Sequence, residues 1–126
     1  MNAVMPSIDN NSPFRVFTLE ETPHHSSANY GDVWSLLDKT FAEVKLIRLP
    51  PGTSHHSKDV GCVTFLFLLK GKVDVKVSRR TVKLAAYEYL LANPKQVIRV
   101  YNLSATEPAE LIGTRYPLDM CYRPIP

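Results

Sequence analysis

Prolines divide this 126-residue chain into segments too short for long helices. The chain has ten prolines and five glycines. Most of the prolines lie near the chain ends and between apolar runs, at Pro13, Pro23, Pro50, Pro51, Pro94, Pro108, Pro117, Pro124 and Pro126. Because proline cannot donate a ladder hydrogen bond, it is confined to turns, strand starts and edges. The spacing therefore predicts many short strands.

Strands are expected where apolar and β-branched residues run between these breaks, at 14–19, 41–49, 63–69, 73–77, 81–84, 89–91, 97–101 and 109–115. The segment 30–39 is either a short helix or an irregular strand. In 72–77, valines alternate strictly with Lys72, Asp74 and Lys76, as in a half-buried strand. The prediction is an all-β fold, a jelly-roll β-barrel of about eight to ten short strands with an irregular N-terminal segment.

Length and composition are those of one globular domain. The apolar fraction is 44% and the formal charge is +3, which is too mild for a dedicated DNA-binding module. We expect residues 1–12 to be a disordered leader and 13–126 to be one domain with a short C-terminal tail. Cys62 and Cys121 form no CxxC motif, so a reducing compartment is expected.

The strand at 63–69 is apolar on both faces, and only one face of a small barrel points inward. One interpretation is that the N-terminal segment covers the second face, with Trp34, Leu36 and Leu37. The other is a homodimer, whose interface is predicted at Phe65, Leu66, Phe67, Leu68, Trp34 and Leu37. The first assignment places Leu66 and Leu68 outward, with Phe65, Phe67, Val73 and Val75 in the core. The reverse assignment stays open, because a shift of one residue exchanges the faces.

Two stretches resemble the two conserved motifs of the cupin family. LPPGTSHHSKDVGCVTFLFLLKGKVDV is similar to the first motif and AYEYLLANPKQVIRVYN to the second. The framework residues are Pro51, Gly52, Gly71, Pro94 and Asn102. The resemblance covers residues 41–115 and implies a jelly roll.

The metal ligands of the cupin motifs are missing. Counted from Gly71, the ligand Glu falls on Thr64, and counted from Asn102, the last ligand His falls on Ile98. His55 and His56 are adjacent, so on a strand they would point to opposite faces. We expect them, like His24 and His25, in an exposed loop. The prediction is no metal, no cofactor and no catalysis.

One branch of the cupins is especially similar, the C-terminal cupin domain of centromere protein C (CENP-C). The similarity lies in TFLFLLKGKVDVKV, RTVKL, NPKQ and VYNLS. It implies a nuclear, centromeric homodimerisation module of the inner kinetochore that also binds a factor loading the centromeric histone. Alternatives from other classes are a metal-free small-molecule cupin, an isomerase or sensor with a pocket at Thr64, Tyr87, Tyr89 and Tyr101, and an interaction domain unrelated to centromeres.

Two further surfaces are predicted. Tyr116, Leu118, Met120 and Tyr122 in the tail form a docking patch for the histone-loading partner or another kinetochore protein, unless they fold back on the barrel. The basic residues around one hairpin either protect an edge strand from aggregation or contact nucleic acid or an acidic partner. These residues are Lys70, Lys72, Lys76, Arg79 and Arg80. No membrane contact and no small-molecule substrate are expected.

Overall fold

The computed structural model describes residues 13–28, 31–39, 41–57 and 61–117. This part of the chain contains ten strands, one 3-10 turn at Leu19–Glu21 (η1) and no α-helix. The strands are β1 (His24–Ser27), β2 (Gly31–Lys39), β3 (Ala42–Leu49), β4 (Ser54–Ser57), β5 (Cys62–Lys70), β6 (Lys72–Val77), β7 (Arg80–Ala85), β8 (Tyr89–Ala92), β9 (Ile98–Tyr101) and β10 (Ala109–Pro117). No helix in the described ranges has the length and apolar character needed to cross a membrane.

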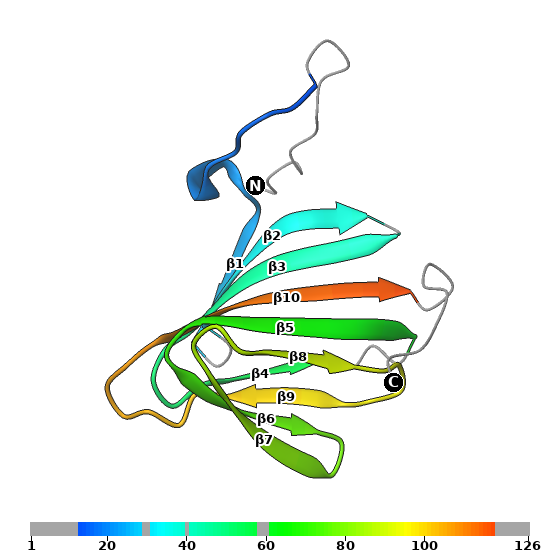
Figure 1. The fold of residues 1–126 in the computed structure, drawn as a ribbon. Coiled ribbons are helices and arrows are strands. Elements are labelled where there is room, and N and C mark those ends of the chain that lie inside the picture. Colours follow the sequence, from blue (N-terminus) through cyan, green and yellow to red (C-terminus); the bar gives the residue numbers. More distant parts are fainter. Residues whose placement is uncertain (1–12, 29–30, 40, 58–60, 118–126) are drawn as a thin grey trace.

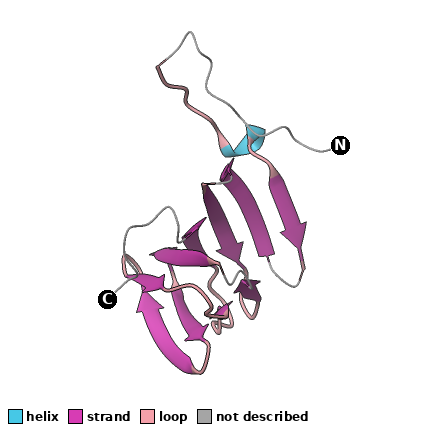
Figure 2. Ribbon diagram, turned by 90° about the vertical axis from the view of Figure 1, so that its right-hand side faces the viewer, coloured by secondary structure: helices cyan, strands magenta, loops and turns pink. Residues whose placement is uncertain are grey.

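The strands form two antiparallel sheets. One sheet has six strands in the order β1-β2-β3-β10-β5-β8, and the other has four in the order β4-β9-β6-β7 (Figure 1). Seen from the side, the two sheets lie apart as separate layers (Figure 2). The predicted all-β jelly roll is confirmed, but the described strands form a two-sheet sandwich rather than a closed barrel.

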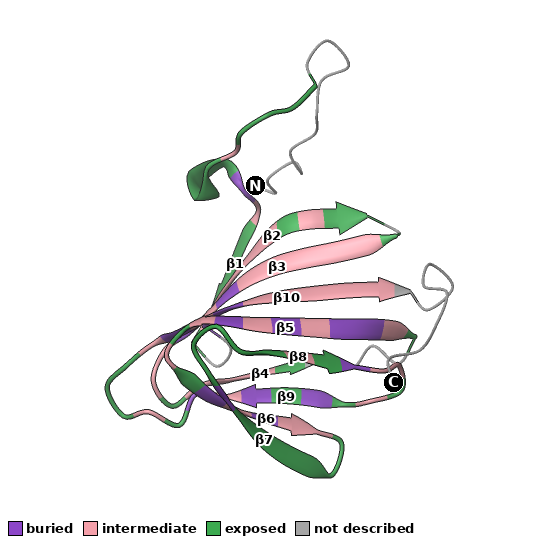
Figure 3. Ribbon diagram, in the orientation of Figure 1, coloured by how far each residue is buried: buried purple, intermediate pink, exposed green. Residues whose placement is uncertain are grey.

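The core lies between the two sheets. Its fully buried side chains come from both layers, with Leu49, Leu68 and Leu111 on the larger sheet and Val75 and Val100 on the smaller. Figure 3 shows the buried stretches of β5 and β9 against the mostly exposed edge strand β7. The predicted core positions Val73 and Val75 are confirmed, since both are buried.

The face assignment of β5 differs from the first expectation. Leu66 and Leu68 are buried in the core, whereas Phe65 and Phe67 are only half-buried. Leu66 and Leu68 therefore point between the sheets and are not surface residues, so their prediction as dimer contacts is wrong. The reverse assignment, with both phenylalanines outward, is the one that the structure adopts.

Several strand boundaries were predicted well and others were missed. Seven of the predicted strands overlap β3 and β5 to β10, and 30–39 holds the irregular strand β2, whose register shifts between Ser35 and Leu37. The predicted strand at 14–19 is wrong, because the described residues 13–23 contain no strand. The histidine pairs predicted in loops lie instead on β1 and β4.

The N-terminal segment does not cover the outer face of the larger sheet. Figure 1 shows described residues 13–21 projecting away from both sheets, and Phe14 and Val16 are 69% and 79% exposed. Trp34 and Leu37 belong to β2, so they extend the sheet instead of lying over it. The predicted leader 1–12 and the tail residues 118–126 lie outside the described residues.

Candidate functional site

The outer face of the six-stranded sheet is apolar across five strands. Residues directly opposite each other on paired strands share a face, and the pairing register gives two rows that run through β2, β3, β10, β5 and β8. The first row is Trp34, Leu46, Ile112, Phe67 and Tyr89. The second row is Leu37, Val44, Thr114, Phe65 and Leu91. Nine of these ten residues are apolar or aromatic, and we call the set the apolar face.

Four aromatic rings gather at the β8 end of the apolar face. The ring centroid of Phe65 lies 5.4 Å from that of Tyr89, and the ring centroid of Phe67 lies 6.4 Å from those of Tyr87 and Tyr89. Such spacings allow favourable ring contacts. Tyr87 and Tyr89 remain 76% and 58% exposed, so the cluster is open to solvent on its outer side.

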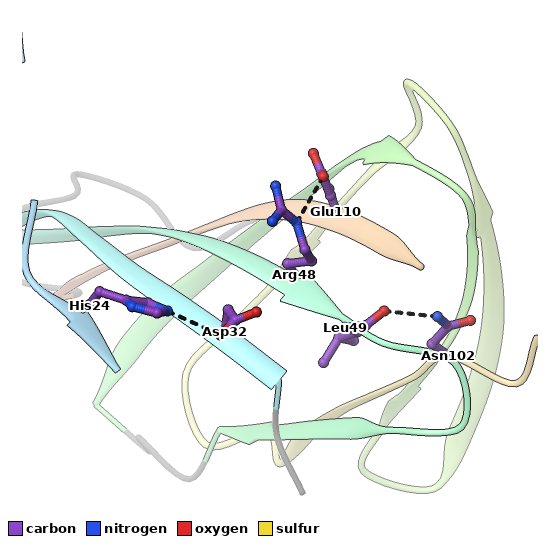
Figure 4. Close-up of polar contacts among 6 residues, drawn as sticks. All are labelled: His24, Asp32, Arg48, Leu49, Asn102 and Glu110. Atoms are coloured by element: carbon purple, nitrogen blue, oxygen red, sulfur yellow. Dashed lines mark hydrogen bonds and ion pairs between the residues drawn. The ribbon is translucent and has the colours of Figure 1, made fainter. Parts of the chain in front are cut away.

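Polar groups border the apolar face at the β1 end. The His24 ring stacks on Trp34 at 4.6 Å, and its Nε2 lies 3.1 Å from an Asp32 carboxylate oxygen. The Arg48 guanidinium lies 5.2 Å from the centroid of the Trp34 ring. The Nε of Arg48 donates a hydrogen bond to Glu110 Oε1 at 3.0 Å (Figure 4). An apolar centre with a polar rim is the usual anatomy of a protein interface.

The Asp32 carboxyl in this rim is held in its charged form. A hydrogen bond from Ser26 is the main cause that lowers the pKa of Asp32, and His24 and Arg48 lower it further against a small opposing effect of burial. The rim therefore keeps its negative charge at neutral pH.

The structure brings together four of the six residues predicted for the dimer interface. Trp34, Leu37, Phe65 and Phe67 share the apolar face, whereas Leu66 and Leu68 lie on the inner side. The sequence prediction missed the contributions of β3, β8 and β10 to this face. For β3, the alternation of apolar and charged residues in 42–46 was the available signal.

The interior between the sheets holds a small cavity of about 170 Å³, lined by both apolar and charged side chains. An ion-pair triad of charged residues lies at its wall: Arg115 donates to Glu43 Oε1 at 2.7 and 3.2 Å, and Lys45 Nζ lies 3.2 Å from the same oxygen. Burial alone would raise the pKa of the Glu43 carboxyl, but Arg115 and Lys45 outweigh it and hold that pKa below its ordinary value.

His55 also lines this cavity. It lies on β4 opposite Val100 of β9, and its Nδ1 is buried without a hydrogen-bond partner within the described part of the chain. Burial is the first cause that lowers the pKa of His55, followed by the positive charge of Lys45. The expectation of an exposed loop is therefore wrong for His55, which is a half-buried strand residue whose lowered pKa favours the neutral imidazole.

These residues do not fit a divalent metal ion. Thr64 and Ile98, which occupy the cupin ligand positions, both line the cavity, but neither is a strong metal ligand. The ammonium of Lys45 and the guanidinium of Arg115 would repel a cation at the same place. Within the described ranges no three His, Cys, Asp or Glu side chains come close enough together to hold a metal ion.

The cavity differs from the predicted small-molecule pocket. Of the four residues predicted to line it, only Thr64 does. Tyr87 and Tyr89 belong to the aromatic cluster outside the sheet, and Tyr101 is half-buried on β9. The charged groups Glu43, Lys45 and Arg115 were not predicted. The period-2 series Glu43, Lys45, Ile47 and Leu49 was the available signal that one face of this strand points inward.

The other predicted surface residues are dispersed. Tyr116 lies on β10, opposite Val63 of β5, and therefore belongs to the sheet rather than to a tail. The docking residues Leu118, Met120 and Tyr122 lie outside the described residues. The basic residues belong to the end of β5 and to the β6–β7 hairpin, as Lys70, Lys72, Lys76, Arg79 and Arg80.

Comparisons with known proteins bear on the fold. No family model matches the chain. No curated protein matches it either. Many solved structures do match. A predicted oxalate decarboxylase from Thermotoga maritima is similar with a TM-score of 0.71 at 19% identity, over 82% of this chain and 100% of that one. An RmlC-like cupin from Shewanella frigidimarina is similar with a TM-score of 0.68 at 17% identity, over 84% and 92% of the two chains.

The fold is that of the cupin superfamily. The Cnp3 cupin domain of Schizosaccharomyces pombe is also similar, with a TM-score of 0.60 at 14% identity, over 80% of this chain and 64% of that one. These neighbours thus include one named as a predicted oxalate decarboxylase and one named only as the cupin domain of Cnp3. At these identities the likeness shows the cupin fold, and function must be argued from the residues of this chain.

Proposed function

We propose that this chain is a non-catalytic homodimerisation module in which two copies pack through their apolar faces. The observation that carries the proposal is the pair of cross-strand rows, which put nine apolar or aromatic residues on one open sheet face. Contiguous apolar surface of this extent is uncommon on monomers and marks interaction sites. A second copy is the occupant, because a flat sheet face is self-complementary about a twofold axis.

The outer side of the larger sheet is large enough for an interface. Five strands spaced by about 4.8 Å span about 19 Å, and a nine-residue strand such as β5 is about 30 Å long, so this side has a planar area on the order of 600 Å². The two apolar rows lie two residues apart along the strands and occupy about half of that area. Each partner of a standard-size interface buries about 800 Å² of accessible surface, so the proposed interface includes the polar rim as well as the apolar face.

The biological setting proposed is the inner kinetochore. The resemblance of the sequence to the C-terminal cupin domain of CENP-C supports it, and so does the structural likeness to the Cnp3 cupin domain, Cnp3 being the fission yeast CENP-C. In this proposal the nuclear, centromeric dimer holds two long chains together. Two tethered chains raise the effective concentration of the second binding segment once the first is bound.

Docking of a second protein completes the proposal. Tyr116, Leu118, Met120 and Tyr122 would bind a centromeric histone-loading chaperone or another kinetochore protein. A Met120→Glu variant should lose that binding while the dimer persists, measured by pull-down with the purified chaperone and by sedimentation. Retention of chaperone binding by a folded, dimeric Met120→Glu variant would remove this part of the proposal.

The small size of the interior cavity supports a non-catalytic role. A cavity of about 170 Å³ is well below the roughly 300–1,000 Å³ of most small-molecule sites. Its wall is also held by the ion pairs of Glu43 with Arg115 and Lys45.

Sedimentation velocity on matched variants tests the dimer. Phe67→Glu places a charge at the centre of the apolar face and should give a folded monomer. Leu103→Glu places the same charge on another exposed apolar residue, 70% exposed outside the sheets, and should leave the dimer intact. Equal sedimentation of the Phe67→Glu variant and the unmodified chain, with unchanged circular dichroism, would overturn the proposal.

A second candidate function rests on one specific observation, the unpartnered Nδ1 of His55 in the cavity. That nitrogen could bind a polar group of a very small ligand in a metal-free sensor or isomerase. Native mass spectrometry of the purified chain would show such a ligand as a discrete added mass, which should vanish in a His55→Phe variant. No added mass would favour the non-catalytic module.

A further inference from the structure

The described cations of the smaller sheet lack carboxylate partners, unlike three cations of the larger sheet. On the larger sheet, Lys45, Arg48 and Arg115 each have a carboxylate partner within 3.2 Å. On the smaller sheet and its hairpin, none of the cations forms an ion pair with another described residue. These unpaired cations include Lys72, Lys76, Arg79, Lys83 and Arg99, and we call these five residues the basic face.

The pairing register places Lys72, Lys76, Lys83 and Arg99 on one side of the sheet, and Arg79 lies in the turn between β6 and β7. Val73, Val75 and Val100 point into the core, so the alternate residues of β6 and β9 point outward. Lys76 lies directly opposite Arg99, and Asp74 lies opposite Lys83. Like charges at directly opposed positions destabilise a sheet, so the Lys76–Arg99 pair has a cost in the isolated chain.

The net charge is concentrated on this side. The five cations and Asp74 sum to a formal charge of +4, whereas the whole chain carries +3. Glu88 and Glu107 line one hollow together with Lys72, Asp74 and Lys83, so the positive excess is greatest at the hairpin end. Lys72, Lys83 and Arg99 are exposed to solvent. A shallow hollow of about 290 Å³ lies at the hairpin end, lined by Lys76, Arg79, Arg99, Ser78 and Val97. Three cations around one hollow are suited to a phosphate group.

We propose that the basic face binds the phosphodiester backbone of duplex DNA without regard to sequence. A phosphate backbone needs only cations and hydrogen-bond donors spread over a surface. An acidic polypeptide would instead need an apolar centre to anchor it, and the outward positions of β6 and β9 carry a single aromatic residue, Tyr101 opposite Asp74. The proposal needs only backbone contacts from cations spread over the face, so no sequence preference is expected.

The basic face is separate from the apolar face. The two lie on the outer sides of opposite sheets, so a dimer formed through the larger sheets would leave both basic faces open on opposite sides. DNA binding therefore does not depend on dimerisation, although a dimer could hold two DNA segments. Failure of one proposal leaves the other standing.

The strength of binding should fall steeply with salt. Five phosphate contacts give a slope of about −4.5 in a plot of log K against log salt concentration. That slope corresponds to about a 500-fold loss of affinity between 50 and 200 mM salt. Removing two contacts should reduce the slope to about −2.7.

Fluorescence anisotropy with labelled duplexes of two unrelated sequences tests the proposal. The unmodified chain should bind both equally, and a Lys76→Glu/Arg99→Glu variant should bind at least tenfold more weakly at 50 mM salt. The control is Arg15→Glu/Lys39→Glu, which changes the net charge equally at exposed positions away from the basic face and should retain most of the affinity. Sedimentation of the basic-face variant as the unmodified chain would show that dimerisation is unaffected.

Three results would overturn the proposal. The first is no binding to either duplex at 50 mM salt. The second is an equal loss of affinity in the control, which would assign binding to net charge alone. The third is binding of poly-glutamate in preference to DNA, which would identify the partner as an acidic polypeptide.

Discussion

Replacing Asn102 by Ala should destabilise the fold strongly, because it removes a buried side chain that makes three hydrogen bonds. The residue is 1% exposed at the end of β9. Its Nδ2 donates to the carbonyl oxygens of Leu49 at 2.9 Å and Glu107 at 2.8 Å, and its Oδ1 accepts from Ser104 N at 3.1 Å (Figure 4 shows the first). The side chain thus connects the end of β3 to the loop that leads into β10.

The magnitude follows from these three hydrogen bonds. A buried hydrogen bond contributes about 1 kcal/mol net, so Asn102→Ala should cost about 3 kcal/mol. For a domain of this size, 1 kcal/mol corresponds to about 4 °C in Tm. The expected decrease is therefore about 12 °C, measured by thermal unfolding followed by circular dichroism at pH 7.

Two companion variants make the test specific. Ser104→Ala removes a side chain that accepts from the exposed amides of Thr106 and Glu107, which water can satisfy, so its cost should stay below about 1 kcal/mol. Asn102→Asp keeps the shape and the acceptor but places a carboxylate against two carbonyl oxygens. It should be at least as unstable as Asn102→Ala at pH 7 and recover partly in acid. Equal Tm values for Asn102→Ala and Ser104→Ala would refute the argument.

Further predictions concern two glycines and the pH dependence of stability. Gly31 and Gly52 have φ of +78° and +76°, but a Cβ at Gly31 would collide with the Arg48 backbone, whereas one at Gly52 meets open space. Gly52→Ala should therefore cost about 1 kcal/mol and Gly31→Ala about 3 or more in urea unfolding; equal costs would contradict this. Since the folded pKa of His55 lies below 6.5, the unfolded state binds more protons in acid, and the free energy of unfolding should fall from pH 7 to 5. Glu43, whose folded pKa lies below 4.5, should extend the loss at lower pH. The His55→Asn variant should lose the first part of this slope, and an unchanged slope would contradict the assignment.

Most of the fold could be predicted from local sequence patterns. The turn at Gly71 followed by the alternating strand 72–77 predicted both β6 and the burial of Val73 and Val75. The cupin-like framework predicted the jelly roll. By contrast, β1 and β4 were missed because each contains a pair of adjacent histidines among polar residues, and such short polar strands form only because a neighbouring strand pairs with them.

The candidate site was predicted only in part. That β5 carries apolar residues on both faces was evident, but the choice between Leu66 and Phe65 as inward residues was not. A shift of one residue exchanges the two faces, and both sets are apolar, so local pattern alone cannot decide. The rings of Phe65 and Phe67 point outward, where they contact Tyr89 and Tyr87, which β8 and the turn before it bring to that side.

The charged interior was also beyond local prediction. Glu43 and Arg115 are 72 positions apart in the chain and become neighbours only when β3 pairs with β10. A charged residue in a strand is ordinarily assigned to solvent. Here the ion pair, with Lys45 beside it, allows charge to lie at the wall of the cavity.

The most direct test of the central claim is native mass spectrometry of the purified chain over a dilution series to low micromolar concentration. The account predicts a dimer that persists on dilution and carries no metal and no small ligand, and a Phe67→Glu variant that is monomeric under the same conditions. A monomer at every concentration, or a monomer with a bound ion or small molecule, would contradict the account.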